Sequence, residues 1–152
     1  MKFKLLVKAV EMLLGDVYSD EKRANTWDMY QTMKVLSLGL ILTLGGAGFT
    51  IYGVLGQKVK MVVIAIVCLF LGIWAIVSWK NETIKILSEE TFEYTNLFGK
   101  TKMYRFADIT GLKEHRDSVD VMLGQEKVHI DSNAVMSEKL IQKLRIALSG
   151  KI

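Results

Sequence analysis

The sequence predicts a membrane-spanning α-helical hairpin followed by an α+β domain, a small antiparallel β-sheet or partial barrel capped by a C-terminal helix. Three observations predict this fold class. Two long stretches without any charged residue lie between Lys34 and Lys80. After Lys80, polar and apolar residues alternate as they do in half-buried β-strands. From Met136 onward, apolar residues recur at helical spacing. The chain therefore divides into an N-terminal segment (1–33), the hairpin (34–80) and the β domain (81–152).

The uncharged stretches have the length of membrane spans. One holds 23 residues between Lys34 and Lys58, and the other holds 19 between Lys60 and Lys80. At roughly 1.5 Å per residue, each crosses a hydrocarbon core of about 30 Å. The expected spans are Val35–Leu55 and Met61–Trp79, and the short link between them allows only an antiparallel hairpin. The alternative is a pair of buried core helices, which is hard to accommodate in 152 residues.

Small residues recur along one face of each predicted span. They allow helix backbones to approach closely in lipid, where packing replaces the hydrophobic driving force. We expect the two faces to meet within the hairpin, although either one could instead drive homodimerisation. The residues are Gly39, Thr43, Gly46, Thr50 and Gly53 in the first span and Ala65, Cys68, Gly72 and Ala75 in the second.

Charge narrows the classes of function. Neither span contains an ionisable side chain of the kind that ion pathways, proton relays and intramembrane catalytic sites need, so transport and intramembrane catalysis are disfavoured. The net charge of +4 is spread thinly along the chain, which disfavours nucleic acid as a partner. The lysines and arginine that flank the two predicted spans favour an orientation with both termini in the cytoplasm.

The N-terminal segment carries apolar residues at spacings of three and four, from Phe3 to Val17. This pattern predicts an amphipathic helix. It lies either on the membrane, with its lysines toward anionic head groups, or against the C-terminal domain or a partner. Residues 19–33 are polar and mixed in charge, and we expect them to lead helically into the first span.

Six strands are predicted after the hairpin. A glycine-containing turn at Gly99 joins the second to the third. Asp131, Ser132 and Asn133 offer helix caps, and the helix Ser137–Leu148 follows. The predicted strands cover residues 82–86, 91–95, 102–106, 109–115, 119–123 and 127–130.

This organisation resembles the bacterial pleckstrin-homology-like (PH-like) membrane proteins, in which a two-helix hairpin precedes a short PH-like domain. The residues that carry the resemblance are the turn Leu97–Lys100, the following Tyr104–Ile109 and the closing helix. The resemblance implies a partial barrel with that helix at one open end, and a multi-pass protein of the bacterial plasma membrane. A full PH fold has seven strands, one more than the six counted here. In phosphoinositide-binding PH domains the basic residues crowd the first hairpin, whereas the corresponding turn here is Ser-Glu-Glu at residues 88–90.

Few residues are candidates for chemistry. Lys100, Lys102 and Arg105 form a small basic group that would suit a lipid phosphate or an acidic peptide, or would simply be a solvated strand face. His115 and His129, the two histidines, have no metal-ligand spacing, and we expect His129 to point outward. Nothing places Asp108, His115 and Ser118 within reach of one another as a catalytic triad. We therefore expect no cofactor, no metal and no enzymatic activity.

The expected function is that of a membrane-anchored binding or assembly module, which presents its PH-like domain at the cytoplasmic face of the membrane. Its expected partners are membrane lipid together with a protein partner or a second copy of the chain. Two other functions stay open. One is an anionic-lipid sensor that uses the basic group at Lys100, Lys102 and Arg105, and the other is a small pore-forming or membrane-lesion protein.

Overall fold

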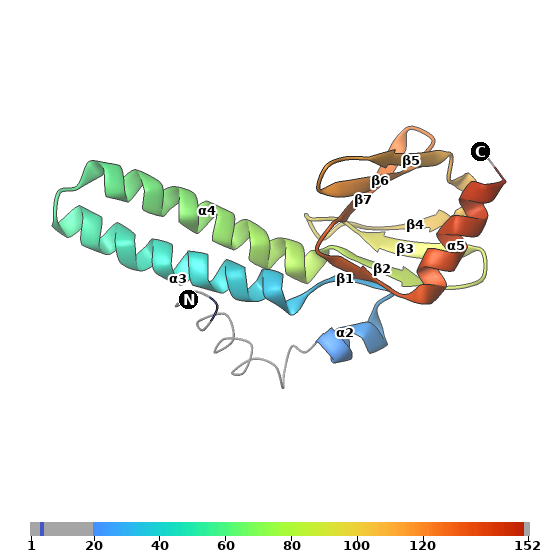
Figure 1. Ribbon diagram of the computed structural model, residues 1–152, viewed down its shortest axis with the longest axis horizontal. Helices are drawn as coiled ribbons and strands as arrows, with labels where there is room; N and C mark the ends of the chain where they lie inside the picture. The colour runs from blue at the N-terminus through green and yellow to red at the C-terminus, as the bar shows by residue number, and fades with distance from the viewer. Residues whose placement is uncertain (1–3, 5–19, 151–152) are drawn as a thin grey trace. The chain divides into compact units, whose positions relative to one another are not determined.

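The computed structural model describes residue 4 and residues 20–150, which form two compact units (Figure 1). One unit contains the helical residues Met33–Trp79, and the other combines Asp20–Thr32 with the chain from Lys80 onward. The amphipathic helix expected within residues 1–18 lies outside the described residues, apart from the single residue Lys4.

The first unit is an antiparallel pair of long apolar helices. Helix α3 spans Met33–Leu55 and α4 spans Val59–Asn81, and both contain 23 residues. Both are long and apolar enough to cross a membrane, judged by length and composition. Helix α3 begins two residues before the predicted span Val35–Leu55 and ends with it. Helix α4 extends two residues beyond each end of the predicted span Met61–Trp79, and the flanking lysines are part of both helices.

The helices approach most closely at their glycines. A Cβ atom on Gly72 would lie 2.6 Å from the backbone nitrogen of Thr43. One on Gly46 would lie 2.9 Å from the carbonyl oxygen of Ala65. Real Cβ atoms do not come so close, so only glycine permits this backbone separation. By contrast, Gly45 and Gly48 on α3 have nothing within 4 Å of a Cβ position.

The second unit is an α+β domain with two antiparallel sheets that face each other across the core (Figure 1). The larger sheet has the order β4-β3-β2-β1-β8, and the smaller has the order β5-β6-β7. The strands are β1 (Met29–Gln31), β2 (Thr83–Ile86), β3 (Thr91–Thr95), β4 (Thr101–Arg105), β5 (Gly111–Glu114), β6 (Ser118–Leu123), β7 (Glu126–Asp131) and β8 (Ala134–Met136). A 3₁₀ turn, η1 (Phe106–Asp108), joins β4 to the smaller sheet.

The prediction that residues 19–33 lead helically into the first span is wrong. Only Asp20–Thr26 is helical, as α2, and Met29–Gln31 forms β1. Strand β1 lies between β2 and β8 and pairs with both. The predicted domain boundary at residue 81 therefore omits part of the domain, because a strand that precedes the helical hairpin in the chain completes the larger sheet.

Asp28 fixes this N-terminal strand to the rest of the domain. Its side chain accepts hydrogen bonds from the backbone N–H of Ile86 (2.8 Å) and from the hydroxyl of Ser137 (3.0 Å). Its backbone N–H donates to Ile84, and its carbonyl oxygen accepts from the N–H of Ser137 at 2.7 Å. One aspartate thus ties residues before the hairpin to β2 and to the start of the C-terminal helix.

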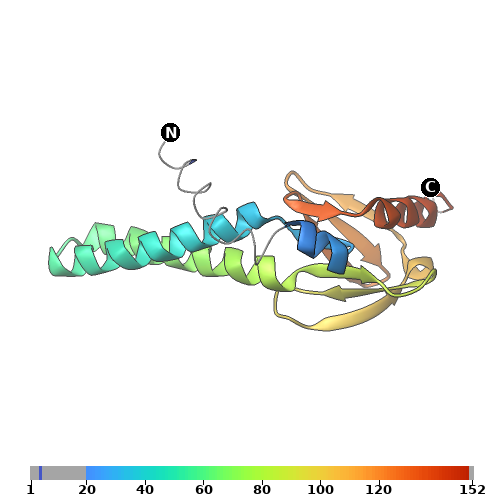
Figure 2. The ribbon, with the colours of Figure 1, turned by 90° about the horizontal axis from the view of Figure 1, so that it is seen from below.

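The C-terminal helix α5 (Glu138–Ser149) begins later than its predicted caps imply. Residues 132 and 133 form a turn, and Ala134–Met136 adds the short strand β8, which runs directly into α5 (Figure 2). The cap is Ser137, whose hydroxyl accepts the N–H of Leu140 at 3.2 Å. Glu138 in the first turn suits the positive end of the helix dipole. Seven strands therefore follow the hairpin instead of the predicted six.

The core of the domain lies between the two sheets and is closed by α5. Phe92 stacks in tilted geometry on Phe106, with ring centroids 4.8 Å apart, and Leu140 of α5 is fully buried among them. The predicted turn at Gly99 is confirmed. Its φ of 75° lies in the left-handed region that favours glycine.

Candidate binding groove

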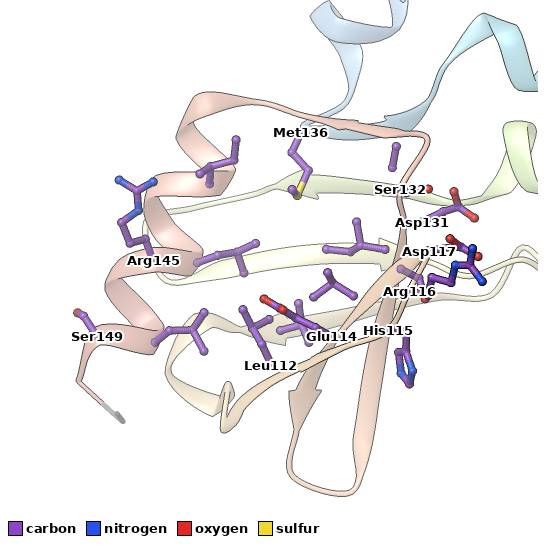
Figure 3. A pocket seen from close by; sticks show the side chains of 18 residues that line it. Leu112, Glu114, His115, Arg116, Asp117, Asp131, Ser132, Met136, Arg145 and Ser149 are labelled. Atoms are coloured by element: carbon purple, nitrogen blue, oxygen red, sulfur yellow. The ribbon is translucent and has the colours of Figure 1, made fainter.

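An open cavity of about 680 Å³ lies between α5 and the inner face of the smaller sheet (Figure 3). This volume is typical of ligand-binding clefts. Its apolar walls come from β5, β6, β7, β8 and α5. The apolar lining residues are Leu112, Val119, Val121, Ile130, Ala134, Met136, Ile141, Leu144 and Leu148.

The groove exists because α5 covers only part of the core. Leu140 packs fully inside, whereas Ile141 on the neighbouring side of the helix stays 37% exposed. Across the groove, Leu112 of β5 stays 44% exposed. The apolar walls formed by β5 and α5 therefore face each other, and no side chain of the described residues fills the space between them.

The groove borders an unpaired strand edge. Strand β5 pairs with β6 on one side, and no described strand pairs with the other side. An edge strand presents backbone N–H and C=O groups that can accept another strand. Leu112 and Glu114 project into the groove, while the ring of His115 points away from it (Figure 3).

Charged side chains surround the mouth of the groove. No two of the charged rim residues, all in the described part of the chain, form an ion pair with each other. The rim combines both signs, so the groove is not a dedicated anion site. The charged residues are Glu114, Arg116, Asp117, Asp131 and Arg145.

The opposite face of the smaller sheet holds a buried carboxylate. Asp120 on β6 is 2% exposed. It accepts hydrogen bonds from His115 Nε2 (3.1 Å), Lys127 Nζ (2.9 Å) and His129 Nδ1 (2.7 Å). Since an ionised carboxylate only accepts, these contacts fix the nitrogen through which each histidine donates.

This network determines the charge state of Asp120. Burial alone would raise its pKa, but the hydrogen bonds from Lys127, His129 and His115 together outweigh burial and hold the pKa of Asp120 far below its usual range. The network joins His115, which directly follows β5, to β6 and β7 on the face opposite the groove. It therefore holds β5, one wall of the groove, in place.

Tyr94 of β3 is buried in the core that the two sheets share. Burial, with a smaller contribution from the charge of Glu82, raises the pKa of Tyr94 to about 12. The hydroxyl consequently stays neutral, which suits a structural contact between sheets.

The basic group predicted as a binding site is largely neutralised. Lys102 forms an ion pair with Glu126, which raises the pKa of Lys102 and lowers that of Glu126. Arg105 pairs with Asp108 at 3.1 Å. Lys102 and Arg105 line an open depression of about 770 Å³ along β4, whereas Lys100 lies in the preceding turn and does not line it.

The remaining sequence candidates separate in the structure. Asp108 pairs with Arg105 and His115 with Asp120, so Asp108, His115 and Ser118 form no triad. No group of three or more potential metal ligands gathers within residue 4 and residues 20–150. Cys68 is a free thiol on α4. Sequence reasoning missed Asp120, although an acidic residue between Val119 and Val121 was a signal of a polar position on the strand face opposite the core.

Together the fold and the groove define a class of protein: an α+β domain that carries a pair of long apolar helices inserted between its strands β1 and β2 and has an open apolar groove beside an edge strand. The chain belongs to a family of unknown function, DUF6560, whose model matches residues 7–149. No curated protein and no solved structure matches the chain.

Proposed function

We propose that this chain is a membrane-anchored binding module that holds a segment of a partner protein in the groove between β5 and α5. The observation that carries the proposal is the unpaired edge of β5 beside an apolar cavity. Strand addition to an exposed edge gives affinity through main-chain hydrogen bonds, and adjacent pockets give specificity through side chains. The groove offers both features in one place.

Helices α3 and α4 are the proposed anchor. Each 23-residue helix is roughly 35 Å long at 1.5 Å per residue, enough to cross a bilayer. The basic flanks support an orientation with both ends of the hairpin, and hence the domain, in the cytoplasm. Anchoring concentrates the domain at the membrane, so that weak contacts with a partner held at the same surface become effective.

The proposal includes a PH-like fold for the domain. Two antiparallel sheets around one core and a closing C-terminal helix support it. Two features depart from the expected pattern: β1 precedes the hairpin, and β8 adds an eighth strand. Anionic-lipid sensing at Lys100, Lys102 and Arg105 is the weaker candidate, because carboxylates already pair with Lys102 and Arg105.

The proposal is tested by site-specific photo-crosslinking in native membranes. A photoreactive amino acid replaces Leu112 in the groove, and a matched control replaces Ile146, an equally apolar and 72% exposed residue of α5 that does not line the groove. We expect a discrete protein adduct from position 112 that is absent from position 146. Mass spectrometry then maps the crosslinked segment.

Each outcome decides between the candidate functions. An adduct with a segment of another protein, or of a second copy, supports the binding module and identifies the partner. An adduct with lipid alone at position 112 contradicts protein binding in the groove. Equal and diffuse adducts from positions 112 and 146 contradict a specific site there.

A further inference from the structure

The side chains of β5 alternate in a way that restricts what can bind its free edge. Leu112 and Glu114 line the groove, and Lys113 between them points to the opposite face of the sheet. A strand added to this edge would also alternate, with one set of side chains entering the groove and the other set lying beside Lys113. The two sets meet different chemical surroundings.

Strand β6, the existing neighbour of β5, shows which residues suit these positions. Val121 lies opposite Leu112, Asp120 opposite Lys113 and Val119 opposite Glu114. An apolar–acidic–apolar sequence therefore already pairs with β5 on its occupied side. Directly opposed residues on neighbouring strands interact favourably when their charges are opposite.

Lys113 is available to a second acidic partner. The carboxylate of Asp120 is hydrogen-bonded to His115, Lys127 and His129. Lys113 is exposed and forms no ion pair with any other residue in the described part of the chain. On the groove side, the exposed carboxylate of Glu114 disfavours an acidic residue and the apolar walls favour a hydrophobic one.

We propose that the groove accepts an extended protein segment in which apolar residues alternate with acidic residues. Its apolar side chains enter the groove beside Leu112, and its acidic side chains lie on the other face beside Lys113. This inference rests on the proposed function, because it names the chemistry of the partner segment that the same groove would hold.

A charge-reversal experiment tests the proposal. The full chain in detergent is titrated into two fluorescein-labelled heptapeptides, Thr-Val-Asp-Val-Asp-Val-Thr and its counterpart with lysine in place of aspartate, and binding is followed by fluorescence anisotropy. We expect the wild type to prefer the aspartate peptide by about two- to fivefold, a ratio within the range and toward the upper end for one favourable cross-strand charge pair. Lys113→Glu should reverse this preference. Lys85→Glu, which reverses an exposed charge on β2 that lines neither the groove nor the depression along β4, should leave it unchanged.

The results separate failure of this inference from failure of the proposed function. If both peptides bind the wild type and Lys113→Glu equally well, strand addition stands and the acidic preference is wrong. If Lys85→Glu reverses the preference as effectively as Lys113→Glu, the preference reflects overall charge and the assignment to β5 is wrong. If neither peptide binds, the inference is overturned, and crosslinking at position 112 independently decides whether the groove holds a protein segment.

Discussion

Met29 and Ile84 lie directly opposite each other in adjacent antiparallel strands, although the whole helical hairpin lies between them in the chain. The hairpin is therefore an insertion into a connection between two neighbouring strands of one sheet. Because β1 and β2 are parts of one folded domain, the residues on the two sides of the hairpin have to be on the same side of any membrane that it crosses.

This pairing predicts the accessibility of single cysteines in a Cys68→Ala background. Lys22→Cys and Lys100→Cys should be protected together or labelled together by a membrane-impermeant maleimide added to sealed cells. Gln57→Cys, in the link between α3 and α4, should show the opposite behaviour. With cytoplasmic termini, only Gln57→Cys is labelled from outside. Opposite labelling of Lys22→Cys and Lys100→Cys would contradict the pairing of β1 with β2 in a membrane-spanning chain.

Asp28 should matter for the stability of the domain to which it belongs, although most of that domain follows it in the chain by some fifty residues. Asp28→Ala removes acceptors for the N–H of Ile86 and the hydroxyl of Ser137. We expect the free energy of unfolding to fall by about 1–3 kcal/mol, since two partly buried donors lose their acceptor. Pulse proteolysis of the full chain in urea measures the change. Asp108→Ala, which breaks an exposed ion pair with Arg105, is the control and should cost less than about 1 kcal/mol.

The network at Asp120 predicts a defined pH dependence. Asp120→Asn should lower stability at neutral pH by about 1–3 kcal/mol, because the amide is neutral and places donors against donors. The pKa of Asp120 is lowered in the folded state, so its stabilising effect is complete above the unfolded pKa of about 3.9 and is lost progressively as the pH falls from that value toward the lower folded value. The difference between wild type and Asp120→Asn should therefore stay constant down to about pH 5 and then shrink toward about pH 2.

The measurement is the melting temperature of both proteins in detergent across this range. A difference that grows as the pH falls below 4 would contradict an ionised Asp120 held by its three donors. The controls are His115→Gln and His129→Gln, each of which keeps a donor and should be milder than Asp120→Asn.

The close approach of α3 and α4 predicts a sharp contrast between glycines. Gly72→Ala places a methyl group against the backbone of Thr43, and overpacking of this kind costs about 1–3 kcal/mol. Gly48→Ala adds the same methyl group where nothing lies within 4 Å and should be neutral or stabilising, because alanine favours a helix. Thermal stability in mild detergent distinguishes them. Equal effects of the two substitutions would exclude the packing described here.

The sequence predicted the elements whose pattern is long and regular. The uncharged stretches predicted α3 and α4, and the alternation around Ile84 and Phe92 predicted β2 and β3. These predictions succeed because each pattern repeats over several residues. Strands β1 and β8 are only three residues long and show no alternation. They form because neighbouring strands supply their hydrogen-bond partners, and that information is not local.

The sequence did not predict the groove or the Asp120 network either, and the reason is again that the information is not local. Asp120 and His129 lie on β6 and β7 and His115 directly follows β5, and only the register of these strands brings the three side chains together. The groove begins where α5 stops covering the core, between the buried Leu140 and the partly exposed Ile141. The position of this boundary depends on the fold. The basic group was recognised from the sequence, but the partners of Lys102 and Arg105 became visible only with the fold.

The most direct test of the account is the hydrogen–deuterium exchange of β5 in the full chain, compared between native membranes and the purified protein in detergent. If a partner segment adds to the free edge, the amides of Gly111–Glu114 should exchange more slowly in the native membrane, while those of the central strand β6 should be unchanged. Equal exchange of β5 in both preparations would contradict the central claim that this edge and its groove hold a partner.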